Sequence, residues 1–161
     1  MVSFEIEDVK AFMNNFLVKE TFDSFLLYEL EIHTYVKTSI NGNLNRAWFS
    51  SDEEEIIGDR QFVLWKEIKP QAFGLIKGSK TPTLIRAVLM LSKSNIEKII
   101  QSTHLDYVMD DVNNLSLNIR YENGKLSIIA STSLNTFKID KNLEHQWDGI
   151  AREMLRKNGI L

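Results

Sequence analysis

The sequence contains no cysteine, which excludes a disulfide framework, thiolate metal sites and a cysteine nucleophile. Proline and glycine are scarce, with two and seven residues among 161, so there is little material for a linker between domains. No apolar stretch approaches membrane-spanning length, and the first ten residues include acids but no basic, apolar leader. These absences predict a single domain over residues 1–161, a cytoplasmic location and no membrane partner.

Excess positive charge is also missing, because the formal net charge is −3. This value argues against a generally basic nucleic-acid-binding protein, although a local basic patch remains compatible with it. The motifs G-x-S-x-G, H-E-x-x-H and G-x-G-x-x-G are absent, so the common hydrolase, zincin and dinucleotide-binding classes have no support. We therefore assign no catalytic residue, no metal and no cofactor, and an enzyme is the less favoured class, although it stays open.

Residues 73–92 organise the rest of the chain. A helix is predicted to end at Gly78, a short basic loop follows, and residues 83–91 are apolar except for Arg86. A nearly continuous apolar run is typical of a strand covered on both faces, so we place this strand at the centre of a sheet. The capping-box spacing of Ser94 and Glu97 predicts a helix directly after it.

Hydrophobic periodicity predicts the outer elements. Apolar residues that alternate with polar ones indicate strands, and apolar residues three and four positions apart indicate amphipathic helices. The predicted elements are strands over residues 2–6 and 28–40, an edge strand at residues 137–139, and helices over residues 9–17 and 143–155. The strand over residues 28–40 is expected to keep one face in water.

Two Asn-Gly pairs predict hairpins. If Asn123-Gly124 forms a two-residue type I′ turn, apolar residues lie opposite apolar residues or opposite a threonine, which an apolar strand face tolerates. The same register sets Glu122 opposite Lys125. The other pairs in this register are Tyr121 with Leu126, Ile119 with Ile128, Leu117 with Ala130, and Leu115 with Thr132. Asn41-Gly42-Asn43 is predicted to be a three-residue loop, because that length sets Leu44 opposite Ile40 on the apolar face.

The stretch from Ser50 to Gly78 lies between the first hairpin and the central strand and is predicted to be helical. Ser51 and Glu54 have capping-box spacing, which indicates a helix start. Pro70 is expected to begin a second helical piece, for which Gly78 provides the C-cap.

The two halves of the chain share one element order, which is an apolar strand, a helix, a strand, an Asn-Gly turn and a strand. We therefore predict an α+β fold with a largely antiparallel sheet built from a degenerate β-α-β-β duplication, an inserted helical segment and a C-terminal helix. This order resembles the repeat of DNA sliding clamps, which implies self-association and contact with DNA through Lys10, Lys19, Lys93 and Lys98. The inserted segment and the last helix depart from that repeat.

A second resemblance rests on the length of the chain and on the segment Ile76-Lys-Gly-Ser-Lys-Thr-Pro82. In both respects the chain is similar to a small bacterial family catalogued only as a domain of unknown function. That resemblance implies no chemistry.

A basic loop is the first candidate site. Lys77, Lys80 and the backbone amides around Gly78 could bind a phosphate or another anion, and we group Arg86 with them. The alternative is that these lysines satisfy the carbonyls and dipole at the end of a helix. If Arg86 is buried it requires a carboxylate partner, which we expect on a facing helix.

Two acidic groups are the other candidates. Glu29, Glu31 and His33 lie on one strand face, where they could act as metal ligands or as an acid–base set, although an exposed strand face has the same composition without any site. The loop with His104, Asp106, Asp110 and Asp111 could bind a divalent cation or could be a solvated acidic connection.

These observations favour a non-catalytic binding module for a protein or an anionic partner. Two alternatives remain open. One is a clamp-like, self-associating accessory protein for nucleic acid, and the other is an enzyme that uses Glu29 and His33.

Overall fold

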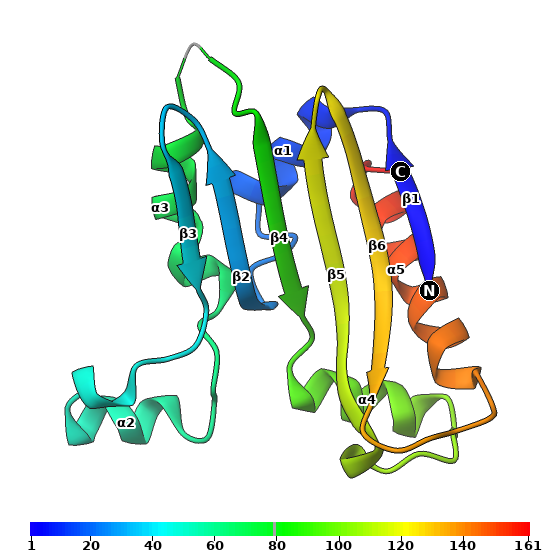
Figure 1. Ribbon diagram of the computed structural model, residues 1–161. Coiled ribbons are helices and arrows are strands. Elements are labelled where there is room, and N and C mark those ends of the chain that lie inside the picture. Colours follow the sequence, from blue (N-terminus) through cyan, green and yellow to red (C-terminus); the bar gives the residue numbers. More distant parts are fainter. Residues whose placement is uncertain (79) are drawn as a thin grey trace.

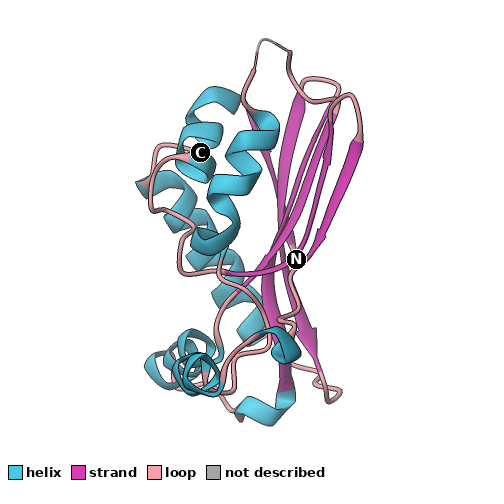
Figure 2. Ribbon diagram, turned by 90° about the vertical axis from the view of Figure 1, so that its left-hand side faces the viewer, coloured by secondary structure: helices cyan, strands magenta, loops and turns pink. Residues whose placement is uncertain are grey.

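The computed structural model describes residues 1–78 and 80–161, and within them the chain forms a six-stranded sheet with helices on one face (Figures 1 and 2). Neighbouring strands are antiparallel, in the order β1-β6-β5-β4-β2-β3. The strands are β1 (Val2–Ile6), β2 (Leu26–His33), β3 (Lys37–Asn41), β4 (Leu84–Met90), β5 (Val112–Glu122) and β6 (Lys125–Leu134). The helices are α1 (Val9–Leu17), α2 (Ser51–Ile57), α3 (Trp65–Ile76), α4 (Lys93–Ser102) and α5 (Asn142–Lys157). The predicted α+β fold, with its antiparallel sheet and C-terminal helix, is confirmed.

Strand β4 lies inside the sheet between β2 and β5, as predicted, but helices cover only one of its faces. Ile85, Ala87 and Leu89 are buried, whereas Arg86 and Val88 alternate with them and are only half-buried. The expectation of cover on both faces was wrong. Leu84 and Met90 share the open face with Arg86 but are only 7% exposed, because side chains of the flanking strands shield a central strand from both sides.

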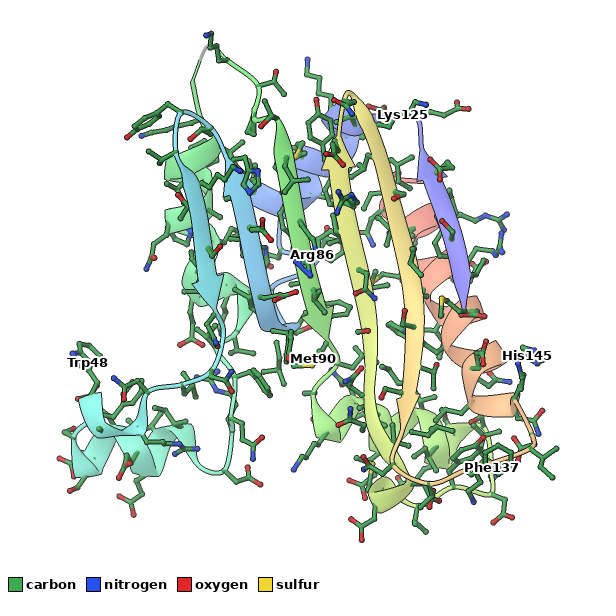
Figure 3. All side chains as sticks on the ribbon, viewed as in Figure 1. Trp48, Arg86, Met90, Lys125, Phe137 and His145 are labelled. Carbon is green, nitrogen blue, oxygen red and sulfur yellow. The ribbon has the colours of Figure 1, made fainter. Side chains whose placement is uncertain are left out.

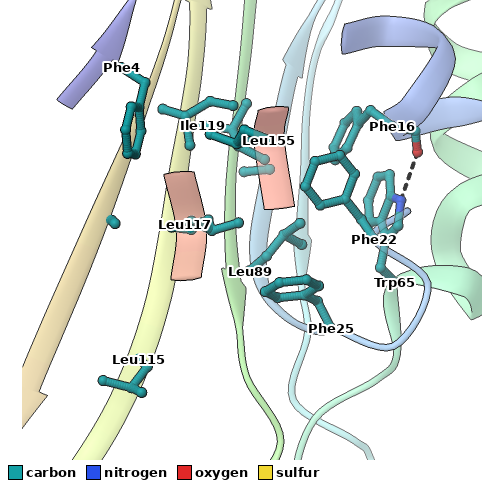
Figure 4. Packing of buried hydrophobic residues seen from close by; sticks show 14 of the residues in the cluster. Phe4, Phe16, Phe22, Phe25, Trp65, Leu89, Leu115, Leu117, Ile119 and Leu155 are labelled. Atoms are coloured by element: carbon teal, nitrogen blue, oxygen red, sulfur yellow. Dashed lines mark hydrogen bonds between the residues drawn. The ribbon is translucent and has the colours of Figure 1, made fainter. Parts of the chain in front are cut away.

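The core lies between the sheet and the helices α1, α3 and α5 (Figure 4). Phe12 and Phe16 of α1 stack on each other, and the Phe16 ring also stacks on Trp65 with 4.2 Å between the ring centroids. The indole nitrogen of Trp65 donates a hydrogen bond to the carbonyl oxygen of Phe16 at 2.8 Å, so the largest buried side chain of α3 has its polar atom satisfied. Each such ring contributes roughly 2–3 kcal/mol of burial free energy.

Strands β2 and β3 meet in a hairpin whose turn was not predicted. The turn consists of Thr34, Tyr35 and Val36, in the middle of the strand expected over residues 28–40. The amide of Thr34 donates to the carbonyl oxygen of Val36 at 3.0 Å, and Leu30 pairs with Ile40. No local pattern marks this turn, because polar and apolar residues continue to alternate through it and it contains no glycine.

The segment Asn41-Gly42-Asn43 is therefore not a hairpin loop, and its glycine has another role. The amide of Gly42 donates to the carbonyl oxygen of Tyr28 at 2.9 Å, and its own carbonyl accepts from the amide of Val63 at 2.8 Å. A bulge between Leu27 and Glu29 brings the two backbones together at this point. The glycine is required for close approach, and not for a turn.

The second hairpin has the predicted register at every pair from Leu115 with Thr132 to Glu122 with Lys125. Asn123 and Gly124 have φ values of 55° and 74°, as a type I′ turn requires. Helix α5 was also predicted correctly, and Gly159 follows it with a φ of 70°. Local turn chemistry was sufficient in both places.

Several predicted boundaries were wrong. The capping box of α2 uses Ser50 and Glu53, one residue before the predicted pair, and α4 is capped by Ser92, two residues before Ser94. Pro70 lies inside α3, which runs through it and ends at Ile76 with Lys77 as the C-cap. Residues 137–139 form no strand, because β6 ends at Leu134 and both Phe137 and Ile139 are exposed.

Residues 44–64 contain α2, the first helix of the inserted segment, and project beyond the edge of the sheet (Figure 1). We call these residues the arm. Its base is closed by a bridge between Asn43 and Phe62 and by a hydrogen bond from the Leu44 amide to the Gln61 carbonyl at 2.9 Å. No residue of the arm is buried.

The element order β1-α1-β2-β3 is repeated by β4-α4-β5-β6. The strand pairing differs between the two halves, since β4, β5 and β6 are adjacent, whereas β1 lies apart from β2 and β3 at the opposite edge. The duplication and the clamp resemblance stay predictions. No helix in the described part of the chain is both long enough and apolar enough to cross a membrane.

Candidate binding site on the open face of the sheet

A pocket of about 280 Å³ lies on the open face of the sheet over β2, β3 and β4. It is centred on Glu29 and Glu31 of β2, whose side chains lie on the face of the sheet away from the helices. The residues lining it are Tyr28, Glu29, Leu30, Glu31, Ser39, Ile40, Asn41, Asn43 and Arg86. Figure 3 shows Arg86 in the middle of this face, where β4 adjoins β2.

The charged groups of the pocket form one network. Arg86 is the direct cross-strand neighbour of Glu31, and its Nη1 donates to Glu31 Oε1 at 3.2 Å. Its Nη2 donates to Glu29 Oε1, two positions along β2. The other oxygen of Glu31 lies 2.8 Å from Nε2 of His33. Arg86 is only 37% exposed, so the pair is partly shielded from water.

This network lowers the pKa of the Glu31 carboxyl below its ordinary value. The hydrogen bond with His33 is the largest cause, followed by the hydrogen bond with Arg86, because both stabilise the ionised form. Glu31 is therefore a fixed carboxylate at neutral pH.

One carboxylate oxygen is left facing the pocket. Within the described part of the chain, Oε2 of Glu29 has no hydrogen-bond partner, whereas Oε1 is held by Arg86. Glu29 pairs across the strands with Asn41, which lies on β3, the side away from Arg86. The polar side chains of Ser39 and Asn41 on the edge strand line the same pocket.

The rim of the pocket depends on the bulge in β2. The bulge puts Tyr28 in a half-exposed position, where its ring lies 5.7 Å from that of Phe62 at the base of the arm. Asn41 Oδ1 accepts from the backbone amide of Asn43 at 2.8 Å, which fixes the chain after β3. Tyr28, Ser39, Asn41 and Asn43 were not predicted as site residues, and Gly42 is the one sequence signal that could have located them.

The proposed anion site divides in two. Lys77 and Lys80 are exposed in the connection between α3 and β4, beyond the end of the sheet, while Arg86 is held by carboxylates within it. Ser79, part of the motif between these lysines, lies outside the described residues. The structure thus does not bring Arg86 together with Lys77, Gly78 and Lys80, and anion binding by these residues stays a prediction. The expected partner of Arg86 was also misplaced, since its carboxylates come from strand β2 and not from a helix.

Several carboxylates of the two acidic candidates are engaged in hydrogen bonds within the chain. Among the described residues, no three histidine or carboxylate side chains are placed to hold a metal ion. In the acidic loop, Asp111 instead accepts hydrogen bonds from the amide of Val108 at 2.9 Å and from the hydroxyl of Thr136 at 2.9 Å. The bond from the Val108 amide is the largest cause of a lowered pKa of Asp111, and the bond from Thr136 follows it. Both bonds hold the loop in place.

Comparison with known proteins gives a family and no chemistry. No curated protein and no solved structure matches the chain. A family model matches residues 15–161, from the second half of α1 to the last residue, and leaves only β1 and the start of α1 outside. The chain therefore belongs to DUF5721, a family of unknown function.

Proposed function

We propose that the protein is a non-catalytic binding module, and that the pocket on the open face of its sheet receives a basic side chain of a partner protein. One observation carries this proposal, namely that the pocket sets two carboxylates against one guanidinium and leaves Oε2 of Glu29 free. A lysine or arginine side chain of the partner could donate a charge-assisted hydrogen bond to Oε2 of Glu29. The hydroxyl of Ser39, which lines the same pocket, could accept a hydrogen bond from the same group.

An anionic ligand fits the pocket less well. It would have to compete with Glu29 and Glu31 for Arg86 and would meet their charges at short range. The anionic partner expected near Lys77 and Lys80 remains a separate proposal for a different end of the molecule.

An enzymatic role has less support than binding. A general acid or base works best with a pKa near the working pH, which for a glutamate means an increase, whereas the pKa of Glu31 is lowered. His33 does not line the pocket. The network is suited to hold charges in fixed positions, which favours recognition over proton transfer.

The clamp-like alternative is also less favoured. It expects Lys10, Lys19, Lys93 and Lys98 to form one basic stripe. Helices α1 and α4, which carry or adjoin these lysines, lie toward opposite ends of the covered face (Figure 1), and their separation weakens such a stripe.

Titration of the isotope-labelled protein with trilysine and triglutamate, followed by amide chemical shifts, tests the binding proposal. Trilysine should shift the amide resonances of Glu29, Ser39 and Asn41 until they saturate. The substitution Glu29→Gln should weaken this binding about tenfold. Residue-level shifts separate this pocket from the acidic arm, which is expected to attract trilysine as well. Saturable shifts of the pocket amides with triglutamate, or an unchanged response in Glu29→Gln, would overturn the proposal.

A further inference from the structure

The arm carries apolar side chains in water. Trp48 is 76% exposed and Ile56 is 87% exposed, and neither the 3-10 turn Arg46–Trp48 nor α2 has a buried residue. Large apolar side chains on a projecting element, with no core beneath them, mark an interaction surface. No described residue buries Trp48 or Ile56, and the arm itself projects away from the sheet (Figure 1).

The arm also accounts for the net negative charge of the protein. Five acidic residues lie inside one eight-residue stretch of the arm. They are Asp52, Glu53, Glu54, Glu55 and Asp59. With Arg46 and Arg60 as its basic residues, the arm has a formal net charge of −3, which is the value for the whole chain. The remainder of the protein is therefore neutral overall, and the arm is its negative pole.

The opposite end of the sheet has the complementary character. Two connections lie side by side there, the β2–β3 turn and the segment from α3 to β4, joined by a hydrogen bond from the Thr83 amide to the His33 carbonyl at 2.9 Å. They present the exposed lysines Lys37, Lys77 and Lys80. Tyr35, 96% exposed, and Val36 add an apolar surface beside them. We call Tyr35, Val36, Lys37, Lys77 and Lys80 the basic tip.

We propose that the arm of one copy docks on the basic tip of a second copy of this chain. Each surface combines exposed apolar side chains with charges of one sign, and the two signs are opposite, which gives both a driving force and a specific pairing. Within one copy the two surfaces lie at opposite ends of the sheet, so they cannot satisfy each other (Figure 1). Arm against arm, or tip against tip, would bring like charges together.

Such a contact is heterologous, because each copy uses two different surfaces. An open chain of such contacts always has one free arm and one free tip at its ends, and it stops growing only when it closes into a ring, of which a reciprocal dimer is the smallest. The assembly should grow with protein concentration and should weaken at high salt, because its charges lie at the surface.

Sedimentation velocity over a range of concentrations tests this inference. At low salt the wild-type protein should form dimers or larger assemblies, and about 0.5 M salt should return it to monomer. Trp48 provides a second signal, since Trp65 and Trp147 are buried in the core and the emission of Trp48 should shift to shorter wavelength on association. A protein that stays monomeric at every concentration at low salt overturns the proposal.

Charge reversal makes the test specific. Glu54→Lys with Glu55→Lys makes the arm repel the basic tip, and Lys77→Glu with Lys80→Glu makes the tip repel the arm, so each variant alone should be monomeric. An equimolar mixture of the two variants should associate again, because each reversed surface now matches the reversed surface of the other. Restoration also shows that both variants are folded. Association of either variant at the wild-type level, or a mixture that stays monomeric, contradicts the pairing.

Discussion

Gly42 lies so close to the backbone of Leu27 that a β-carbon at position 42 would be 1.7 Å from the Leu27 carbonyl oxygen. No side chain can relieve this overlap, since the obstacle is backbone in the bulge of β2. Gly42→Ala should therefore destabilise the protein by about 3 kcal/mol. Chemical denaturation measures the change.

Gly74→Ala provides the matched control. A β-carbon on Gly74 meets nothing within 4 Å, and the residue lies inside helix α3, so alanine should stabilise the fold by about 1 kcal/mol. Equal effects of the two substitutions would show that the close approach at Gly42 has no energetic weight.

Asn15 joins α1 to the end of the chain from a position that is 2% exposed. Its Nδ2 donates to the carbonyl oxygens of Ala11 and Asn158, at 2.8 and 3.2 Å, and its Oδ1 accepts from Thr21 at 2.6 Å. Asn15→Leu should cost about 1–3 kcal/mol, because these partners lose their hydrogen bonds in a buried place. Its exposed neighbour gives the control, and Asn14→Ala should change the free energy of unfolding by less than about 0.5 kcal/mol.

The pKa of Glu31 gives a prediction for acid. A carboxyl with a lowered folded pKa contributes stability that is present above the unfolded value, here 4.5, and is lost as the pH falls through the folded pKa. Carbon-detected NMR should find the Glu31 carboxyl titrating below 4.5 in the wild type. His33→Gln should raise that pKa, and so should Arg86→Met. Titration at 4.5 or above in the wild type would show that the network is absent in solution.

Tyr107 gives the corresponding prediction for base. Burial, and next the hydrogen bond that its hydroxyl donates to Asp140 Oδ1 at 3.1 Å, raise its pKa to about 12. Because this value lies above the unfolded value of 10, the group's contribution to stability is full below pH 10 and is lost as the pH rises toward 12. Absorbance titration of phenolate should show a late phase that belongs to Tyr107. Tyr107→Phe should remove that phase, and its persistence would assign the shift to another residue.

Prediction from the sequence succeeded where structure is decided locally. The Asn123-Gly124 turn was predicted correctly because both of its residues need positive φ and the flanking register is apolar on one face. The helix starts were placed one or two residues late, because Ser50 and Ser51, like Ser92 and Ser94, offer equivalent hydroxyls and only the fold selects between them.

Prediction failed where distant segments meet. The shared face of Glu29, Glu31 and His33 follows from strand alternation, but their partner Arg86 depends on β2 lying beside β4, a pairing that no local pattern encodes. The same limit explains Gly42, whose neighbour is a backbone fifteen positions earlier and not the next strand in a turn.

The pairing of β1 with β6 has a consequence for the newly made chain. Strand β1 is synthesised more than a hundred residues before its partner, residues 125–134, so its apolar side chains stay unpaired while that stretch is made. A nascent chain that stops before β6 should therefore remain open at this edge and should need a chaperone until the final strand arrives.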